Sequence, residues 1–256
     1  MKHPIAVALL LTLRALEATR NGILPEDADA SSALFHAIRN KASCPREGYL
    51  RGALLGNDQE RVHVRLTCIS KGGGSLGSGA LQALAPGGVL QCAGQRYEVE
   101  SADLTDPIWT GVSTWPDMLN QPVGARMRFA FATPLVTSNP AHRQSGDALP
   151  FPGPQVLFAS ALRHWRMLDG PLLPLVGEEM AQAAGCVVSE YRLETAARVL
   201  AGRSHLGFLG WIEYTCRAPE TTAVASLNAL ARLSFFTGCG YLTERGMGVA
   251  TVTIAK

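Results

Sequence analysis

The sequence has little net charge and few aromatic side chains, and it lacks the common metal-binding patterns. The formal net charge at pH 7 is +2 over 256 residues, and 7% of the residues are aromatic. Overall charge therefore does not indicate a nucleic-acid partner. None of the six cysteines belongs to a CxxC pair, and no histidine lies beside one at zinc-ligand spacing. We expect these cysteines to be small buried side chains of a protein in a reducing compartment.

The sequence also has no apolar run long enough to span a bilayer. The run at residues 5–13 follows Lys2 and is similar to the apolar part of a signal peptide. Arg14 ends it, and residues 16–18 form a poor cleavage site. We therefore interpret it as a buried strand, and we expect a cytoplasmic protein with no membrane partner.

The first half of the chain predicts the order of a ferredoxin-like unit. A turn signal at residues 56–58 joins two strands into a hairpin. The full pattern is βαββαβ with an extra strand, which is typical of ferredoxin-like or RRM-like domains. The predicted strands are residues 5–15, 48–55, 61–69, 89–93 and 96–104, and the predicted helices are residues 33–40 and 76–84.

The same order returns after residues 105–124, a stretch rich in proline and tryptophan that we interpret as the connection between domains. A chain of this length has room for two domains. We therefore predict the α+β class, with tandem ferredoxin-like domains at residues 1–118 and 122–256. The second set comprises strands at 126–132, 186–200, 205–217 and 249–254, a helix at 154–168, and a helix that begins at Thr221 or Thr222.

The most specific motif runs from Leu233 to Gly248, between an amphipathic helix and the last strand. Glycine tolerates positive φ and lets backbone N–H groups approach an anion. Arg245 offers a forked contact to a phosphate. The alternative is a loop that needs glycine only for tight turns. The motif follows a helix and enters a strand, which is the reverse of the dinucleotide-binding arrangement. Its four glycines are Gly238, Gly240, Gly246 and Gly248.

Positive charge is concentrated in residues 39–71, which hold seven Lys or Arg against three acidic residues. In the strand 61–69, Val62, Val64 and Leu66 face one side. Arg61, His63 and Arg65 face the other. This pattern indicates a local contact with an anion, and an ordinary solvated face is the alternative.

The sequence resembles CRISPR repeat-RNA-processing endoribonucleases, which belong to a superfamily of repeat-associated RNA-binding proteins. The glycine-rich motif after a Leu- and Ala-rich helix is similar to that of this family. The resemblance covers nearly the whole chain in order. The other similar segments are residues 89–99, 129–134, 149–158 with 163–165, and 206–211.

The resemblance implies cleavage of CRISPR precursor RNA within a repeat hairpin, without a metal or cofactor. The 2′-hydroxyl of the RNA attacks the adjacent phosphorus and leaves a 2′,3′-cyclic phosphate. Histidine suits the general acid and base because it titrates near neutral pH. The alternative is a subunit of a CRISPR interference complex that binds repeat RNA without cutting it, with other subunits as partners. Both a monomer and a homodimer remain open.

His36 is the first candidate for the general acid or base. On the predicted helix 33–40 it points roughly opposite Leu34 and Ile38. Relatives often carry their histidine in a second short helix followed by a lysine, and residues 40–48 contain no histidine. Either His36 has taken that role, or Lys41 or Tyr49 serves instead. An ordinary exposed histidine is the alternative.

The predicted RNA contacts are basic side chains and the loop glycines. Arg203 and His205 lie at the tip of a predicted hairpin, which is a position suited to an RNA groove. The full set is Arg39, Arg46, Arg61, His63, Arg65, Arg203, His205, Gly238, Gly240, Arg245, Gly246 and Gly248.

Overall fold

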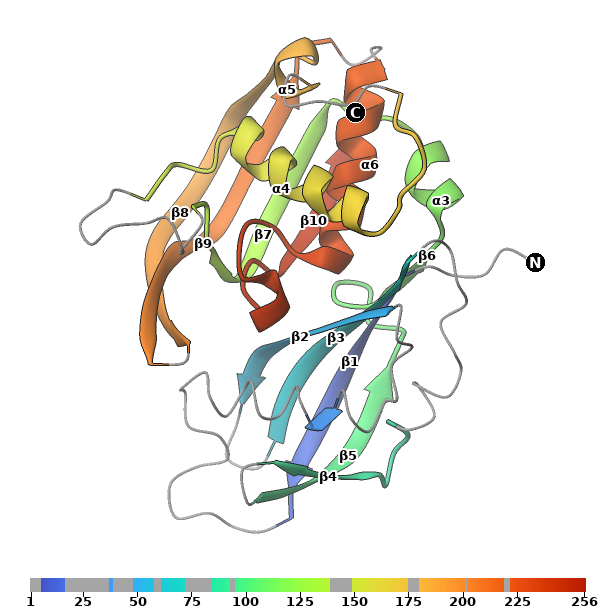
Figure 1. Ribbon diagram of the computed structural model, residues 1–256, viewed down its shortest axis with the longest axis vertical. Coiled ribbons are helices and arrows are strands. Elements are labelled where there is room, and N and C mark those ends of the chain that lie inside the picture. Colours follow the sequence, from blue (N-terminus) through green and yellow to red (C-terminus); the bar gives the residue numbers. More distant parts are fainter. Residues whose placement is uncertain are drawn as a thin grey trace. The chain divides into compact units, whose positions relative to one another are not determined.

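The chain forms two compact units, each with its own antiparallel sheet (Figure 1). The first unit consists of Met1–Ser113, Arg198–Ser204 and Glu244–Gly246. The second consists of Thr114–Ala197, His205–Thr243 and Met247–Lys256. The protein therefore belongs to the α+β class. This computed structural model describes residues 6–16, 37–38, 48–57, 61–71, 84–92, 95–138, 149–174, 180–200, 202–218 and 222–256.

The sheet of the first unit has the strand order β2-β3-β1-β5-β4, and β6 pairs with β1. The pairings of β1 with β3, β5 and β6 are antiparallel, as are those of β2 with β3 and β4 with β5. The strands are β1 (Ala6–Ala15), β2 (Gly48–Asn57), β3 (Arg61–Ser70), β4 (Val89–Cys92), β5 (Gln95–Asp103) and β6 (Gly111–Ser113).

Alternating side chains build the core of this unit. Leu11 lies opposite Val64 and Leu13 opposite Val62, and all four side chains are fully buried. Ile38 packs into the same cluster, and residues 37 and 38 are helical. The rest of the predicted helix 33–40 and most of the predicted helix 76–84 lie outside the described residues.

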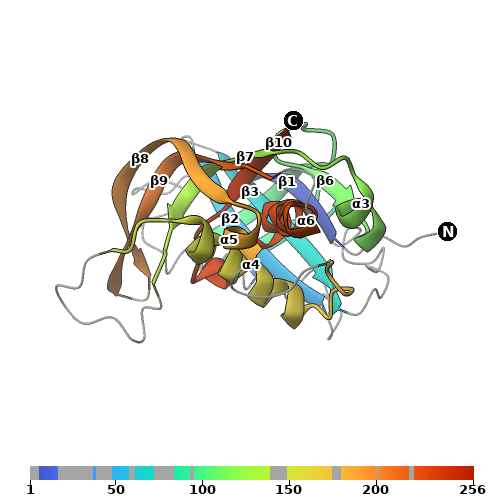
Figure 2. The same cartoon turned by 90° about the horizontal axis from the view of Figure 1, so that it is seen from above.

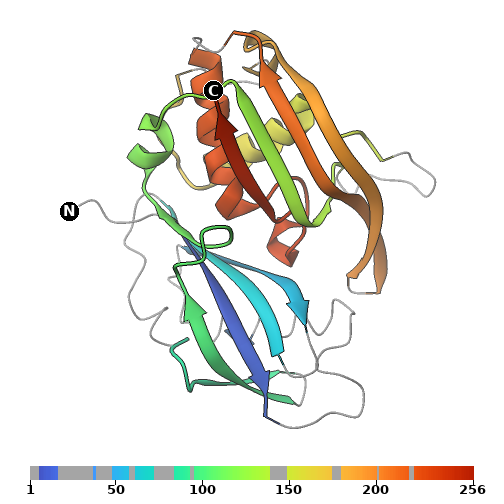
Figure 3. The same cartoon turned by 180° about the vertical axis from the view of Figure 1, so that it is seen from behind.

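The second unit has a four-stranded sheet in the order β10-β7-β9-β8. Helices α4, α5 and α6 lie on one side of it (Figure 2). Figure 3 shows the other side, where none of the described helices covers the strands. Among the described helices, none combines the length and the hydropathy that a membrane span requires. The elements are α3 (Trp115–Asn120), β7 (Arg126–Leu135), α4 (Pro154–Met167), α5 (Met180–Ala183), β8 (Cys186–Leu200), β9 (Arg203–Cys216), α6 (Thr222–Thr237), η2 (Thr243–Arg245) and β10 (Ala250–Ala255).

Helix α6 is the centre of this unit. Its predicted apolar face is buried, as Leu227 and Leu230 show. The polar Asn228 is also fully buried, because α3, α4 and α5 contact α6 as well as the sheet. Its side chain accepts a hydrogen bond from the Gly124 N–H (2.7 Å) and donates one to the Gly124 carbonyl (3.0 Å). A buried amide with both groups bonded fixes the chain segment before β7.

The predicted connection at residues 105–124 contains the boundary between the two units, at Ser113 and Thr114, and it also contains regular structure. It includes β6 and the short helix α3. Thr114 and Asp117 form a capping box at the start of α3: the Thr114 hydroxyl accepts from the Asp117 N–H (3.2 Å), and the Asp117 carboxylate accepts from the Thr114 N–H (3.0 Å).

Candidate functional site

The glycine-rich loop, residues 238–248, joins α6 to β10 and depends on glycine for its shape. A Cβ on Gly238 would lie 3.1 Å from the Gly248 carbonyl oxygen, and one on Gly240 would collide with the carbonyl of Val136. These positions need both the space and the conformational freedom of glycine. All four motif glycines are buried and have positive φ: Gly238 (70°), Gly240 (79°), Gly246 (76°) and Gly248 (65°).

Three of these glycines donate their backbone N–H groups inside the protein. We expected the loop amides to be available to an anion, and for these three the structure corrects that expectation. Because each N–H already has a buried acceptor, the glycines shape the loop and do not form a phosphate cradle. The acceptors of Gly238, Gly240 and Gly248 are the Ser234 carbonyl (2.8 Å), the Ser160 hydroxyl (2.9 Å) and the Pro134 carbonyl (3.0 Å), respectively.

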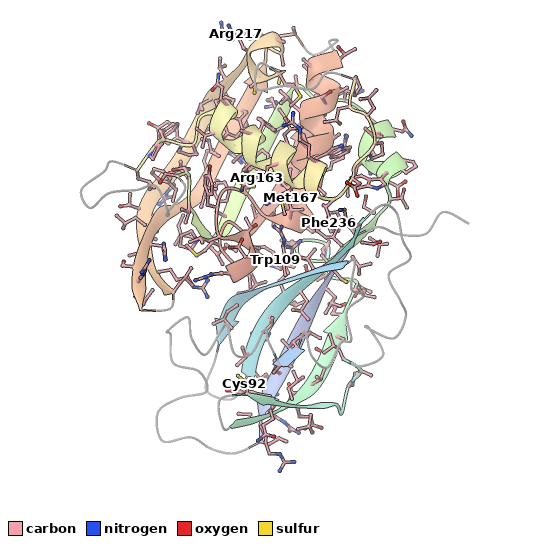
Figure 4. All side chains as sticks on the ribbon, viewed as in Figure 1. Cys92, Trp109, Arg163, Met167, Arg217 and Phe236 are labelled. Carbon is pink, nitrogen blue, oxygen red and sulfur yellow. The ribbon has the colours of Figure 1, made fainter. Side chains whose placement is uncertain are left out.

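Helix α4 holds the loop from the side (Figure 4). A guanidinium N–H of Arg163 donates to the Gly240 carbonyl (2.9 Å), and the same group lies 4.6 Å from the centre of the Tyr241 ring. One residue on, Nε2 of His164 lies 3.4 Å from the Thr243 hydroxyl. The helix is predicted correctly from the sequence, but its contacts with the loop are not. The sequence signal for these contacts is the spacing of Ser160, Arg163 and His164, which puts the three side chains on one face of the helix.

The exposed part of the loop carries a cationic side chain. Leu242 has a φ of 59°, an uncommon conformation for a residue other than glycine, and Glu244 and Arg245 are exposed. Within the described residues no ion-pair partner of Arg245 is found. Glu244–Gly246 belong to the first unit. There a Cβ on Gly246 would lie 2.6 Å from the carbonyl oxygen of Gly52 in β2, so this glycine is also required by close packing.

On the predicted basic face of β3, Arg61 has an acidic partner. Nε of Arg61 lies 2.7 Å from the Glu100 carboxylate, and Arg14 of β1 is paired with Glu98. His63 is half-buried, with its Nδ1 3.4 Å from the Thr12 hydroxyl. Carboxylates beside the arginines reduce the attraction of this face for phosphate.

Arg65 corrects the expectation of an exposed polar face. Its relative exposure is 2%, and its Nε donates to the Trp109 carbonyl (2.9 Å). A second guanidinium N–H donates to the Thr67 hydroxyl (3.3 Å). Burial lowers the pKa of Arg65 to about 10, so the side chain stays protonated at neutral pH. The alternation in β3 is as predicted, but the segment after β5 lies against Arg65 and takes it out of reach of a ligand.

The hairpin of β8 and β9 carries the two remaining basic candidates of the second half. The turn is shorter than predicted, because β9 already begins at Arg203. Arg203 is exposed and His205 is half-buried. Since they are two residues apart on one strand, their side chains point to the same face.

The catalytic candidates fall largely outside the described residues. His36, Arg39, Lys41 and Arg46 lie there, and so does the side chain of Tyr49, whose backbone pairs with Ile69 in the sheet. Their roles therefore stay predictions. Among the described residues, no group of three or more His, Cys, Asp or Glu is placed to hold a metal ion.

Residues 129–250 match the protein-family model described as CRISPR-associated endoribonuclease Cas6. The matched segment includes α4, α6 and the whole glycine-rich loop. Among curated protein sequences, none matches this chain.

The whole chain shares its fold with solved Cas6 structures. Cas6 (TTHB231) from Thermus thermophilus is 21% identical, with a TM-score of 0.71 over 98% of this chain and 99% of that one. The Cas6 (TTHB231) product complex is 23% identical, with a TM-score of 0.73 over 98% of this chain and 100% of that one. A Cas6-related protein from Pyrococcus furiosus is 14% identical, with a TM-score of 0.57 over 97% and 98%. Residues 129–250 therefore match the Cas6 family of CRISPR-associated endoribonucleases, and the whole chain has the fold of solved Cas6 structures.

Proposed function

We propose that this chain cuts CRISPR precursor RNA within the repeat, without a metal ion, and so releases guide RNAs. The match of residues 129–250 to the endoribonuclease family carries the proposal. The fold shared with Cas6 over nearly the whole chain supports it, because those structures include product complexes and a substrate-mimic complex. We also propose that the two sheets belong to ferredoxin-like domains at residues 1–118 and 122–256.

The reaction is an internal transesterification of the RNA. A general base removes the proton of the 2′-hydroxyl, whose oxygen attacks the adjacent phosphorus. A general acid protonates the leaving 5′-oxygen, and the products are a 2′,3′-cyclic phosphate and a 5′-hydroxyl. We assign one of these proton-transfer roles to His36, with Lys41 and Tyr49 as further candidates. A histidine-to-alanine mutant of Cas6 (TTHA0078) is among the similar structures, which favours a histidine for this role.

RNA affinity rests on side chains that the fold leaves available. Arg245 is exposed on a loop that is fixed by buried hydrogen bonds, so little conformational entropy is lost when it binds a phosphate. Arg203 and His205 offer a second contact on the β8–β9 hairpin. Arg39, Arg46, Arg61 and His63 are further proposed RNA contacts, and Arg61 contributes least because it is paired with Glu100. The burial of Arg65 removes it from this set.

A cleavage assay in EDTA tests the proposal. The purified full chain is incubated with end-labelled CRISPR repeat hairpins, and with unstructured RNA of the same base composition as the control. We expect one cut in a hairpin, with a cyclic phosphate on the 5′ fragment. We also expect weaker binding of the control, because the protein recognises the folded shape of the hairpin.

Two outcomes contradict the proposed enzyme. Tight hairpin binding with no cut favours the binding subunit of an interference complex. Cleavage that requires a divalent cation excludes the metal-independent mechanism.

A further inference from the structure

The β8–β9 hairpin, whose base lies in the second unit, has a register that several contacts determine. The strands are hydrogen-bonded neighbours separated by two residues in the chain, so they run antiparallel. In an antiparallel pair, one step forward on one strand matches one step back on the other. Two hydrogen bonds agree with a single register: the Arg217 N–H with the Gly185 carbonyl (3.4 Å), and the Ser189 hydroxyl with the Glu213 carbonyl (3.3 Å). Gly210 also lies close to Arg192, because a Cβ added to Gly210 would collide with the Arg192 carbonyl.

This register places Cys186 directly opposite Cys216, at the open end of the hairpin. Gly185 and Arg217 form the neighbouring hydrogen-bonded pair, so the two cysteines form a non-hydrogen-bonded pair. The N–H of Cys216 accordingly donates to Ala125, away from β8 (2.7 Å). In such pairs the Cα atoms are about 4.5 Å apart, which lies within the range that a disulfide spans. Figure 4 labels Arg217, the residue directly after Cys216.

The two thiols already contact each other. They share a hydrogen bond, and their relative exposures are 6% for Cys186 and 2% for Cys216. This hydrogen bond lowers the pKa of the Cys216 thiol and, together with burial, raises the pKa of the Cys186 thiol. Cys216 is therefore the sulfur that ionises first and attacks an oxidant.

We propose that Cys186 and Cys216 are an oxidative modification site, which closes to a disulfide when the folded protein meets a peroxide. The Cys216 thiolate attacks one peroxide oxygen and becomes a sulfenic acid, and the other oxygen leaves as water. The Cys186 sulfur then displaces a second water from the Cys216 sulfur. Overall two thiols lose two electrons and two protons, and one hydrogen peroxide is reduced to two waters.

In the first unit, the sheet sets residues other than cysteine opposite the described cysteines. Cys68 lies opposite Val7 and Leu50, and Cys92 lies opposite Gln95. The disulfide joins the first residue of β8 to the last residue of β9, so it holds the base of the hairpin closed. The inference is independent of RNA cleavage.

The test exposes the folded full chain to hydrogen peroxide, quenches the reaction and counts thiols after denaturation. We expect the number of free thiols to fall from six to four, and dithiothreitol to restore it. A non-reducing tryptic digest should link the peptide 167–192 to the peptide 204–217. Cys186→Ala and Cys216→Ala should each abolish this link, and Cys68→Ala in the other unit should retain it.

Two results would overturn the proposal: six thiols that survive peroxide in the folded wild-type protein, or a link between other cysteines. The peptide map of the wild-type protein decides the question even if a variant fails to fold.

Discussion

Strand β3 and the glycine-rich loop both carry arginines that the sequence presents as RNA contacts, but the fold treats them differently. On β3, Arg61 is paired with Glu100, and Arg65 is buried against the Trp109 carbonyl. On the loop, Arg245 is exposed, and the described residues give it no ion-pair partner. A sequence shows which side chains are cationic, and packing decides which of them a phosphate can reach. The predictions below test this difference, after first separating chemistry from binding.

The largest expected effect is on the chemical step. His36→Ala should lower the single-turnover cleavage rate by about 10²–10⁴-fold, the usual contribution of a general acid or base. RNA affinity should stay nearly unchanged, because the loop arginine remains. His142→Ala, at a histidine with no proposed role, is the matched control. An unchanged rate in the His36 variant would move the chemistry to Lys41 or Tyr49.

The next largest expected effect is on protein stability. It tests whether the glycine-rich loop is rigid. Gly240→Ala should destabilise the protein by about 3 kcal/mol, because the backbone has a positive φ and the new Cβ collides with the Val136 carbonyl. Gly202→Ala is the control: its φ is also positive (71°), but nothing lies within 4 Å of its Cβ position, so we expect a loss of about 1 kcal/mol. The shift of the urea unfolding midpoint measures the loss of stability in both variants. Equal shifts would show that the loop relaxes around an added methyl group.

Arg163 tests whether the loop must be held from α4. Arg163→Gln removes the hydrogen bond to Gly240 and the stacking on Tyr241, so we expect a loss of about 1–3 kcal/mol in stability together with weaker RNA binding. Arg166→Gln removes the same charge from the same helix at an exposed position and is the control. If both variants weaken binding equally, the effect is one of net charge and not of loop position.

The smallest expected effects are on RNA affinity. They compare Arg245 of the loop with Arg61 of β3. Arg245→Ala should weaken binding several-fold for all RNA sequences and reduce the salt dependence by about one phosphate contact. Arg61→Ala should change affinity much less, since Glu100 already neutralises that side chain. Titrations of labelled hairpin at several salt concentrations measure both slopes. A larger loss of RNA affinity in the Arg61 variant than in the Arg245 variant would contradict this comparison.

Most of the described strands could be predicted from the sequence, because side chains that alternate across a sheet leave a period of two. The segment at residues 105–124 could not. Its prolines and tryptophans indicate a linker, yet three of its residues form β6 by pairing with Ala6–Ala8 of β1. A strand this short carries no pattern of its own, so only the tertiary partner defines it.

The glycine-rich loop was predictable as a loop, and its hydrogen bonds were not. The acceptor for the Gly240 N–H is Ser160, which lies 80 residues earlier in the chain. Likewise, the alternation on β3 correctly set Arg65 on the face opposite Val64, but the carbonyl that binds it comes from Trp109, 44 residues later. Local patterns report secondary structure, whereas the state of a functional group depends on partners that are distant in sequence.

The central claim is that the RNA supplies its own nucleophile, and a 2′-deoxy substitution tests it most directly. Once the cut in the all-ribose hairpin has been mapped, the nucleotide on its 5′ side is replaced by the deoxynucleotide. We predict that cleavage at that bond is abolished in EDTA while the hairpin still binds with nearly the same affinity. Continued cleavage of the deoxy-substituted RNA at the same bond would contradict the account.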